Sequence, residues 1–291
     1  MSQNPAVVTG LQTEQSITRT TLSWRSLGFE PLIDHYRVHA VRGAGRDFEP
    51  TEDNLVGKTV YPHFEHDGLE PLGETWTYRV LARSDAGRLG RPSRPVTATS
   101  TPSVVGTGTP VAVVGAFDGR TLEHRFAPAG YAQIPVEHPD AVVEYVQGRD
   151  TPGTAWPYLL PGPGDAWAGR KVYRARWTFE LTGAPTDSDL AIWLVDTTRL
   201  GGVLQVLLNG TGLTSIELPA GATRGSREGD ATVPGSTLRR CYFEPGVPAD
   251  RLRQGSNTVE LVLAEGGWVA WDAVGLFARP RPGDAGATAG W

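Results

Sequence analysis

The chain has 291 residues, about twice the length of a common domain, so two domains with separate cores are expected. Its 27 lysine and arginine residues are outnumbered by 32 aspartate and glutamate residues, and the formal charge of -5 argues against binding to nucleic acid. One cysteine, Cys241, excludes an intrachain disulfide and a thiolate zinc site. The sequence shows neither the pattern of a signal peptide nor an apolar run of about 18 residues, so no membrane contact is expected.

Turn-forming residues recur throughout the chain. With 36 glycines and 23 prolines, long helices would be interrupted, whereas short runs of β-branched and aromatic residues return at strand length. The sequence therefore predicts an all-β protein. In the segment 75–84, Trp76, Tyr78 and Val80 share one face, as in a strand with one side on a core. In the first hundred residues the expected strands are 20–24, 35–40, 59–69 and 75–84.

Residues 5–99 resemble a fibronectin type III domain. The likeness is carried by Trp24 at the end of one expected strand, by HYRVHA (35–40), and by GLEPLGETWTYRVLARSDAG (68–87). Family members commonly have tyrosine where this sequence has Trp76, so the hydrogen bond at the corner of such sandwiches would come from an indole N–H or be absent. The resemblance implies a spacer or adhesive module and does not imply a ligand. We expect this domain over 1–100 and a linker over 101–114.

A second domain is expected over 115–280, followed by a flexible tail over 281–291. The segment 189–197 is apolar on both faces, which predicts a strand in the middle of a sheet covered on both sides. Residues 115–150 could add strands or a wrapping extension, and the alternation in AVVEYV (141–146) favours strands. The clearest strands are expected at 171–181, 189–197, 202–210, 237–244, 257–265 and 268–279.

This second region resembles the C-terminal carbohydrate-binding-like domain of rhamnogalacturonan lyases and related bacterial polysaccharide-degrading enzymes. The likeness rests on PYLLPGPGDAWAG (157–169), on VLLNG (206–210), and on the closing pair LRQGSNTVELVLAEGGWVAWDAVGLF (252–277). It implies a galactose-binding-like jelly roll, a second β-sandwich. It also implies a place outside the cell as part of a secreted parent protein, because a catalytic domain precedes both modules in those lyases and is absent from this sequence.

The loop AWPYLLPGPGDAWAG (155–169) places large aromatic residues among prolines and glycines. Sugar rings stack their C–H groups on flat aromatic faces and leave their hydroxyls to carboxylates, amides and arginine. The alternative is that the loop crosses an open edge of the sandwich and turns its rings into the core, where large aromatics usually lie. The candidate carbohydrate-binding residues of this loop are Trp156, Tyr158 and Trp167, with Asp165 and Arg170 beside them.

Other candidate ligand residues come from two strands. The amide of Asn209 can bridge sugar hydroxyls, although Asn-Gly is also the commonest hairpin turn. Arg239 and Arg240 lie on opposite faces of one expected strand, so at most one of them points toward a ligand. Arg240 shares its face with Tyr242, which favours this pair.

Asp272 lies in an otherwise apolar strand, where a lone carboxylate needs hydrogen bonds, an ion pair or a metal. Related jelly rolls often carry a structural calcium near their last strand. Backbone carbonyls and Asp118 or Asp196 would then supply further oxygen ligands. The alternative is an ion pair with an arginine such as Arg176. No other cofactor is indicated.

Catalytic motifs are not recognisable in this sequence. None of the six histidines belongs to a zinc-binding helix motif or a nucleophile elbow. We therefore predict non-catalytic carbohydrate-binding and spacer modules whose partner is a polysaccharide or oligosaccharide. One alternative is a piece of a polysaccharide lyase or glycosidase that is active only with a separate catalytic domain, and another is a purely structural module.

Overall fold

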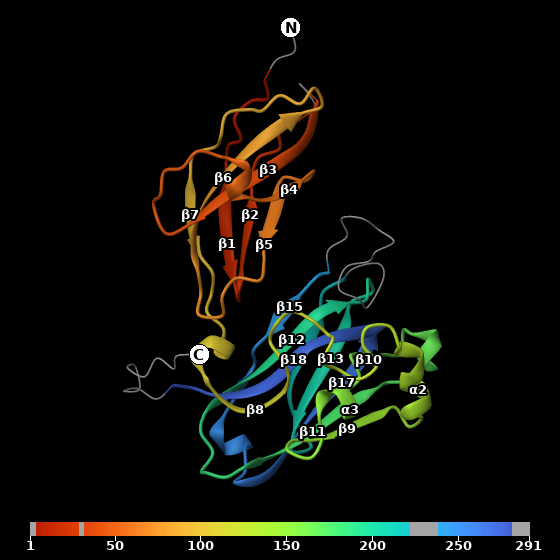
Figure 1. Ribbon diagram of the computed structural model, residues 1–291. Coiled ribbons are helices and arrows are strands. Elements are labelled where there is room, and N and C mark those ends of the chain that lie inside the picture. Colours follow the sequence, from red (N-terminus) through yellow and green to blue (C-terminus); the bar gives the residue numbers. More distant parts are fainter. Residues whose placement is uncertain (1–3, 29–31, 222–237, 281–291) are drawn as a thin grey trace. The chain divides into compact units, whose positions relative to one another are not determined.

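The computed structural model describes residues 4–28, 32–221 and 238–280, which belong to two units, 1–107 and 108–291 (Figure 1). Strands make up most of the regular structure of both units, so the all-β prediction is confirmed. Among these residues no helix is long and apolar enough to cross a membrane. The tail expected over 281–291 lies outside the described residues.

The first unit is a fibronectin type III-like sandwich. As predicted from the alternation of 75–84, Tyr78 and Val80 lie in its core, together with Tyr36, Val38 and Trp24. One sheet contains, in order, β1 (Gln12–Ser16), β2 (Arg19–Ser23) and β5 (His63–His66). The other contains β4 (Leu55–Thr59), β3 (Ile33–Arg42), β6 (Thr75–Ser84) and β7 (Val96–Thr99), and two short helices, η1 (Glu52–Asn54) and α1 (Val104–Thr107), lie outside the sheets.

One strand of the first unit differs from the sequence-based expectation, and the structure decides between the two alternatives for Trp76. The strand expected over 59–69 is instead β4 and β5 with a turn between them, because Pro62 lacks the N–H that a continuous ladder needs. Trp76 does not make the corner hydrogen bond, since its buried Nε1 has no partner among the described residues. Its ring instead lies under the Arg42 guanidinium at 5.3 Å and edge-on to His66 at 4.9 Å.

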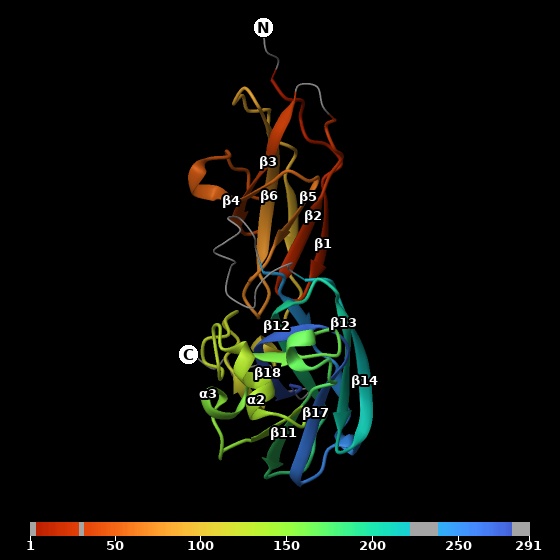
Figure 2. The same ribbon diagram turned by 90° about the vertical axis from the view of Figure 1, so that its right-hand side faces the viewer.

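The second unit is a jelly-roll β-sandwich of two larger sheets. The five-stranded sheet contains, in order, β14 (Thr211–Leu218), β13 (Gly202–Leu208), β17 (Gly255–Gly266), β11 (Arg174–Leu181) and β9 (Val142–Val146), with β9 parallel to β11. Figure 2 labels four of these strands, β14, β13, β17 and β11. The path of the other sheet is β10 (Leu159–Pro161), β18 (Trp268–Ala278), β12 (Ser188–Thr197) and β15 (Cys241–Phe243). Beside it, β8 (Thr109–Gly115) pairs with β18 and β16 (Gly246–Val247) pairs with β12.

Short helical turns connect these strands, and one core fills the space between the sheets. Trp177, Phe179, Leu261 and Trp271 are among its buried side chains. The prediction for 189–197 is confirmed, because β12 has paired strands on both sides and is buried on both faces. The turns are η2 (Tyr131–Gln133), α2 (Ile134–Glu137), α3 (Pro152–Ala155), η3 (Ala166–Ala168) and η4 (Ala249–Arg251).

The start of the second unit differs from the expected linker and strands. Residues 109–114 belong to the expected linker, but 109–115 form β8, which pairs antiparallel with β18 and buries Val114 completely. A short β-branched run carries no signal of its partner strand, so only the tertiary structure reveals this pairing. Within 115–150 the segment 142–146 forms the strand that its alternation favoured, whereas 116–141 wraps around the sandwich and contains η2 and α2.

Candidate functional site

Trp156 and Tyr158 lie in the core of the second unit and cannot stack on a sugar. They are 1% and 0% exposed, and the Trp156 ring packs against those of Tyr145 and Trp271. The physical reason is strand β10, which starts directly after Tyr158 and pairs with β18. The Tyr158 carbonyl accepts a hydrogen bond from the Trp271 backbone N–H, which draws the first half of the loop inward. The carbohydrate-binding prediction is therefore corrected for these two residues.

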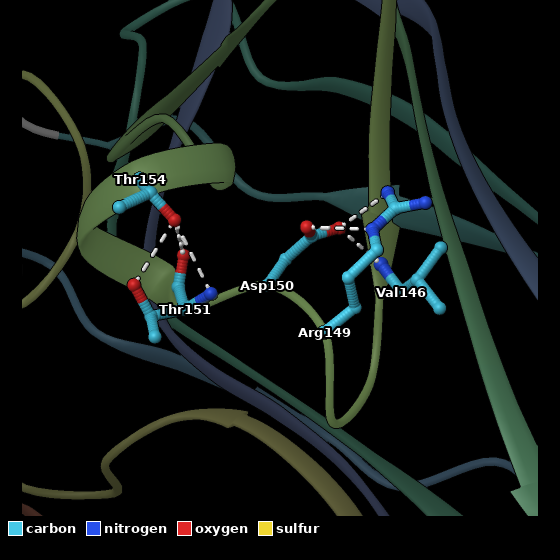
Figure 3. Close-up of polar contacts among 5 residues, drawn as sticks. All are labelled: Val146, Arg149, Asp150, Thr151 and Thr154. Carbon is cyan, nitrogen blue, oxygen red and sulfur yellow. Dashed lines mark hydrogen bonds and ion pairs between the residues drawn. The ribbon is translucent and has the colours of Figure 1, made fainter.

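Polar contacts in the preceding turn fix the entry of the chain into the core (Figure 3). The Asp150 carboxylate accepts hydrogen bonds from the Val146 N–H at 2.8 Å and from the Arg149 guanidinium at 2.7 Å. Both contacts, that with Arg149 most strongly, lower the pKa of Asp150. The Thr151 N–H donates to Thr154 Oγ1 at 3.2 Å, which caps α3. Trp156, the residue after α3, is thereby aimed inward.

The second half of the loop keeps its aromatic residue near the surface. Trp167 lies in η3, is half-buried, and meets the ring of Tyr131 edge-on at 5.1 Å. Tyr131 belongs to η2 and is 43% exposed. Sequence analysis missed Tyr131, because nothing in its neighbourhood indicates that η2 and η3 lie side by side.

Asp165 and Arg170 lie on either side of Trp167 in the sequence. The indole of Trp167 donates a hydrogen bond to the Asp165 carboxylate, and burial raises the pKa of this carboxyl group despite that contact. Arg170 has an exposed side chain, and its backbone N–H donates to the Asp165 carbonyl at 3.0 Å. We call Tyr131, Asp165, Trp167 and Arg170 the Trp167 surface.

A close contact between glycines holds the loop that carries this surface. The Gly164 N–H donates to the Gly266 carbonyl at 2.7 Å, so the loop lies directly on the turn between β17 and β18. A Cβ atom at Gly162 or Gly164 would stand 2.7 Å from that same carbonyl oxygen. The backbones can approach this closely because neither glycine carries a side chain. The loop therefore has a fixed base.

Asn209 forms a structural turn. It has a positive φ of 52°, and its amide nitrogen donates to the Arg251 carbonyl at 3.1 Å and to Asn257 Oδ1 at 3.0 Å. Its side-chain oxygen accepts the Thr258 N–H at 3.0 Å. These contacts use the amide internally, so the turn interpretation fits the structure and the sugar-binding prediction is corrected.

Arg240 and Tyr242 do not join the Trp167 surface. They belong to β15 and its flank, whereas Trp167 follows β10, and β10 and β15 stand at opposite ends of the sheet path. Tyr242 packs edge-on against Trp193 at 4.7 Å, and the Arg240 guanidinium donates to the Gly119 carbonyl at 3.3 Å. Tyr242 therefore packs with Trp193, which is only 5% exposed, away from the Trp167 surface.

Asp272 holds a loop in place through hydrogen bonds and does not form a calcium site. Its Oδ1 accepts the backbone N–H groups of Gly119 at 2.8 Å and of Arg120 at 3.2 Å, while its carbonyl accepts His124 Nε2–H at 2.7 Å. Donors surround the carboxylate where a cation would need oxygen ligands. The described residues contain no group of three or more acidic, histidine or cysteine side chains able to hold a metal. The residues present therefore do not fit calcium.

The alternative partner for Asp272 is also corrected. Arg176 pairs with Glu144 at 2.6 Å and with Glu260 at 3.5 Å, on the outer face of the five-stranded sheet. Asp272 is 1% exposed, and this burial is the main reason why its pKa is raised to about 7. Hydrogen bonds from the loop N–H groups act in the opposite direction.

Comparison with known proteins gives similarity to carbohydrate-related proteins. No protein-family model matches the chain. Endoglucanase B of Cellulomonas fimi is 27% identical over 220 residues, which cover 68% of this chain and 20% of the endoglucanase. The chain thus spans about a fifth of the length of this curated relative.

Similar solved structures include a fibronectin type III domain and a carbohydrate-binding module. The human fibronectin type III domain containing protein 3 contributes a domain with 18% identity and a TM-score of 0.29, covering 35% of this chain and 92% of that domain. A family 35 carbohydrate-binding module from an environmental isolate has 10% identity and a TM-score of 0.27, covering 37% of this chain and 66% of that module.

Proposed function

We propose that the second unit is a non-catalytic carbohydrate-binding module and that the first unit is its spacer. The observation that carries this proposal is the Trp167 surface, where two partly exposed aromatic rings from separate segments meet and an exposed arginine, Arg170, follows three residues later in the chain. An indole face stacks on the C–H groups of a pyranose ring, and Arg170 donates to its hydroxyls. Asp165 positions the ring, because it accepts the hydrogen bond of the Trp167 indole.

The ligand class is a polysaccharide. The name of the curated relative, an endoglucanase, favours a glucan. The resemblance of 157–169 and 252–277 to the rhamnogalacturonan lyase module favours a pectic polymer. Both classes present pyranose rings, and the same surface residues serve either, so a binding assay has to include both.

Affinity electrophoresis through gels that contain single polysaccharides tests this function. We expect glucan or pectic gels to retard the full chain, and Trp167→Ala to weaken binding by about tenfold or more, since stacked aromatics are typical hot spots. Tyr61→Ala is the matched control, because Tyr61 is 63% exposed but lies in the first unit. Circular dichroism establishes that each variant is folded. Unretarded wild-type protein in every gel, or wild-type retardation of a folded Trp167→Ala variant, would contradict the proposal.

The partial coverage of the curated relative favours one further proposal, that the chain is a piece of a longer secreted polysaccharide-degrading enzyme. In that case the chain supplies binding and another domain supplies catalysis. Joining the chain to a glucanase catalytic domain should then raise activity on insoluble glucan more than on soluble oligosaccharides. Equal effects on the two substrates would argue against this role.

A further inference from the structure

A segment of the first unit covers the outer face of its four-stranded sheet. On β3, Tyr36 and Val38 face the core, so the alternating residues Arg37 and His39 face away from it. Residues on such a face are usually open to water, but Arg37 is 6% and His39 is 2% exposed. The segment 43–54, which connects β3 to β4, contacts both Arg37 and His39. We call this segment the strap.

Polar contacts hold the strap. Glu52 pairs with Arg37 at 2.6 Å, and Asp47 pairs with Arg79 of β6. Phe48 is half-buried under the Arg79 guanidinium, while most of the strap is exposed. Because few apolar contacts support it, the strap belongs to the parts of a fold that open at low free-energy cost.

The hydrogen bonds of Asn54 define the protonation state of His39. Asn54 Nδ2 donates to the Glu49 carbonyl at 2.8 Å, and Asn54 Oδ1 accepts the Thr51 N–H at 2.9 Å. These two contacts fix the orientation of the amide, so its oxygen faces His39 Nδ1 at 2.8 Å. His39 Nδ1 therefore carries the hydrogen. His39 Nε2 is a bare, buried nitrogen with no hydrogen-bond partner among the described residues.

A proton on Nε2 would place a charged N–H at a buried position, because His39 is 2% exposed. Burial lowers the pKa of His39 most strongly, and Arg37 lowers it further. The hydrogen bond with Asn54, the nearby Thr51 backbone and the charge of Glu52 act in the opposite direction without reversing the shift. The charged groups around this face are Arg37 of β3, Lys58 of β4 and Arg79 of β6, with Arg46, Asp47, Glu49, Glu52 and Asp53 on the strap.

We propose that the strap is a pH-sensitive cover, closed while His39 is neutral and opened when Nε2 takes up a proton. Opening lets the imidazolium reach water and exposes the face that carries Arg37, His39 and Arg79. The protonated ring is less favourable in the closed state than in the open one. The closed strap is therefore fully stable above the ordinary histidine pKa of about 6.5 and loses stability as the pH falls below it. At pH 5 the opening constant rises by at most about 30-fold relative to pH 7.5.

Hydrogen exchange measured by NMR on the full chain tests the proposal. The readout is the protection factor of the Thr51 amide at pH 7.5 and pH 5.0, corrected for the intrinsic pH dependence of exchange. We expect protection to fall at the lower pH by at most about 30-fold, while the core amide of Val38 keeps its protection. Equal Thr51 protection at the two pH values, or a matching loss at Val38, would overturn the proposal.

Two variants separate His39 from other acid effects. In His39→Gln the side-chain amide can still donate to Asn54 but does not titrate, so Thr51 protection should not change between the two pH values. His63→Gln removes an exposed histidine of the same unit and should behave as the wild type. Acid opening that persists in His39→Gln would refute the mechanism. If His39→Gln does not fold, NMR titration of the His39 ring in the wild type decides, and a pKa at or above the ordinary value would overturn the proposal.

Discussion

Replacing Asp272 by asparagine should remove a pH-dependent penalty from the second unit. The carboxyl group is 1% exposed, and burial raises its pKa from the ordinary 3.8 to about 7. Because the folded state holds this proton more tightly than the unfolded chain, ionisation costs folding free energy. The cost begins as the pH rises above 3.8, is complete above pH 7, and amounts to about 4 kcal/mol. Asparagine keeps an acceptor for Gly119 and Arg120 but does not ionise.

Calorimetry of the full chain between pH 4 and pH 8 provides the assay. The two units can unfold in separate transitions, and the transition of the second unit is the one that a core substitution there displaces. The stability of Asp272→Asn minus that of the wild type should increase with pH by about 4 kcal/mol at most. Asp250→Asn, which removes an exposed carboxylate of the same unit, should give a flat difference. A flat or falling difference for Asp272→Asn would refute the assigned burial effect.

Three further substitutions test the packing of the second unit. Trp156→Ala should lower its unfolding free energy by about 3 to 5 kcal/mol in urea titrations, as expected for a fully buried ring. Asn209→Ala should be less stable than Asn209→Gly by about 1 kcal/mol, because only glycine adopts the φ of 52° without strain. Gly202→Ala should prevent folding of the second unit, measured by loss of its calorimetric transition, since the new Cβ atom would lie 2.1 Å from the Glu265 carbonyl oxygen.

A control variant and two contrary results apply to these three substitutions. Val136→Ala, at a position that is 73% exposed in α2, should change stability by less than about 0.5 kcal/mol. A small effect of Trp156→Ala would return that ring to the list of surface candidates. Equal stability of the two Asn209 variants would show that its hydrogen bonds, and not its backbone conformation, determine the cost.

The fold was largely predictable because its strands carry strong local patterns. The alternation around Tyr78 and Val80 identified a strand with one buried face, and the continuous apolar run in β12 identified a central strand. The strands with weak sequence patterns were not predicted. β1 is polar at nearly every position, and β8 is recognisable only when its partner β18 is known.

The candidate site was less predictable, because exposure of an aromatic ring in a loop depends on contacts distant in sequence. Trp156, Tyr158 and Trp167 look alike in the sequence, but pairing of β10 with β18 buries the first two and leaves Trp167 beside Tyr131. Asp272 was correctly expected to need a partner. The partner is the backbone of a loop that lies more than a hundred positions earlier in the chain, which no side-chain pattern encodes.

The glycine contact beneath the Trp167 surface limits how this module can diversify. Side chains at 162 and 164 would overlap the turn after β17, so substitutions at the base of the loop are sterically barred. Positions 165, 167 and 170 and the outward residues of η2 lie outside that glycine contact. Under the proposed function, changes of sugar preference should therefore arise by exchanging side chains on an unchanged backbone, and directed evolution should concentrate its libraries on those positions.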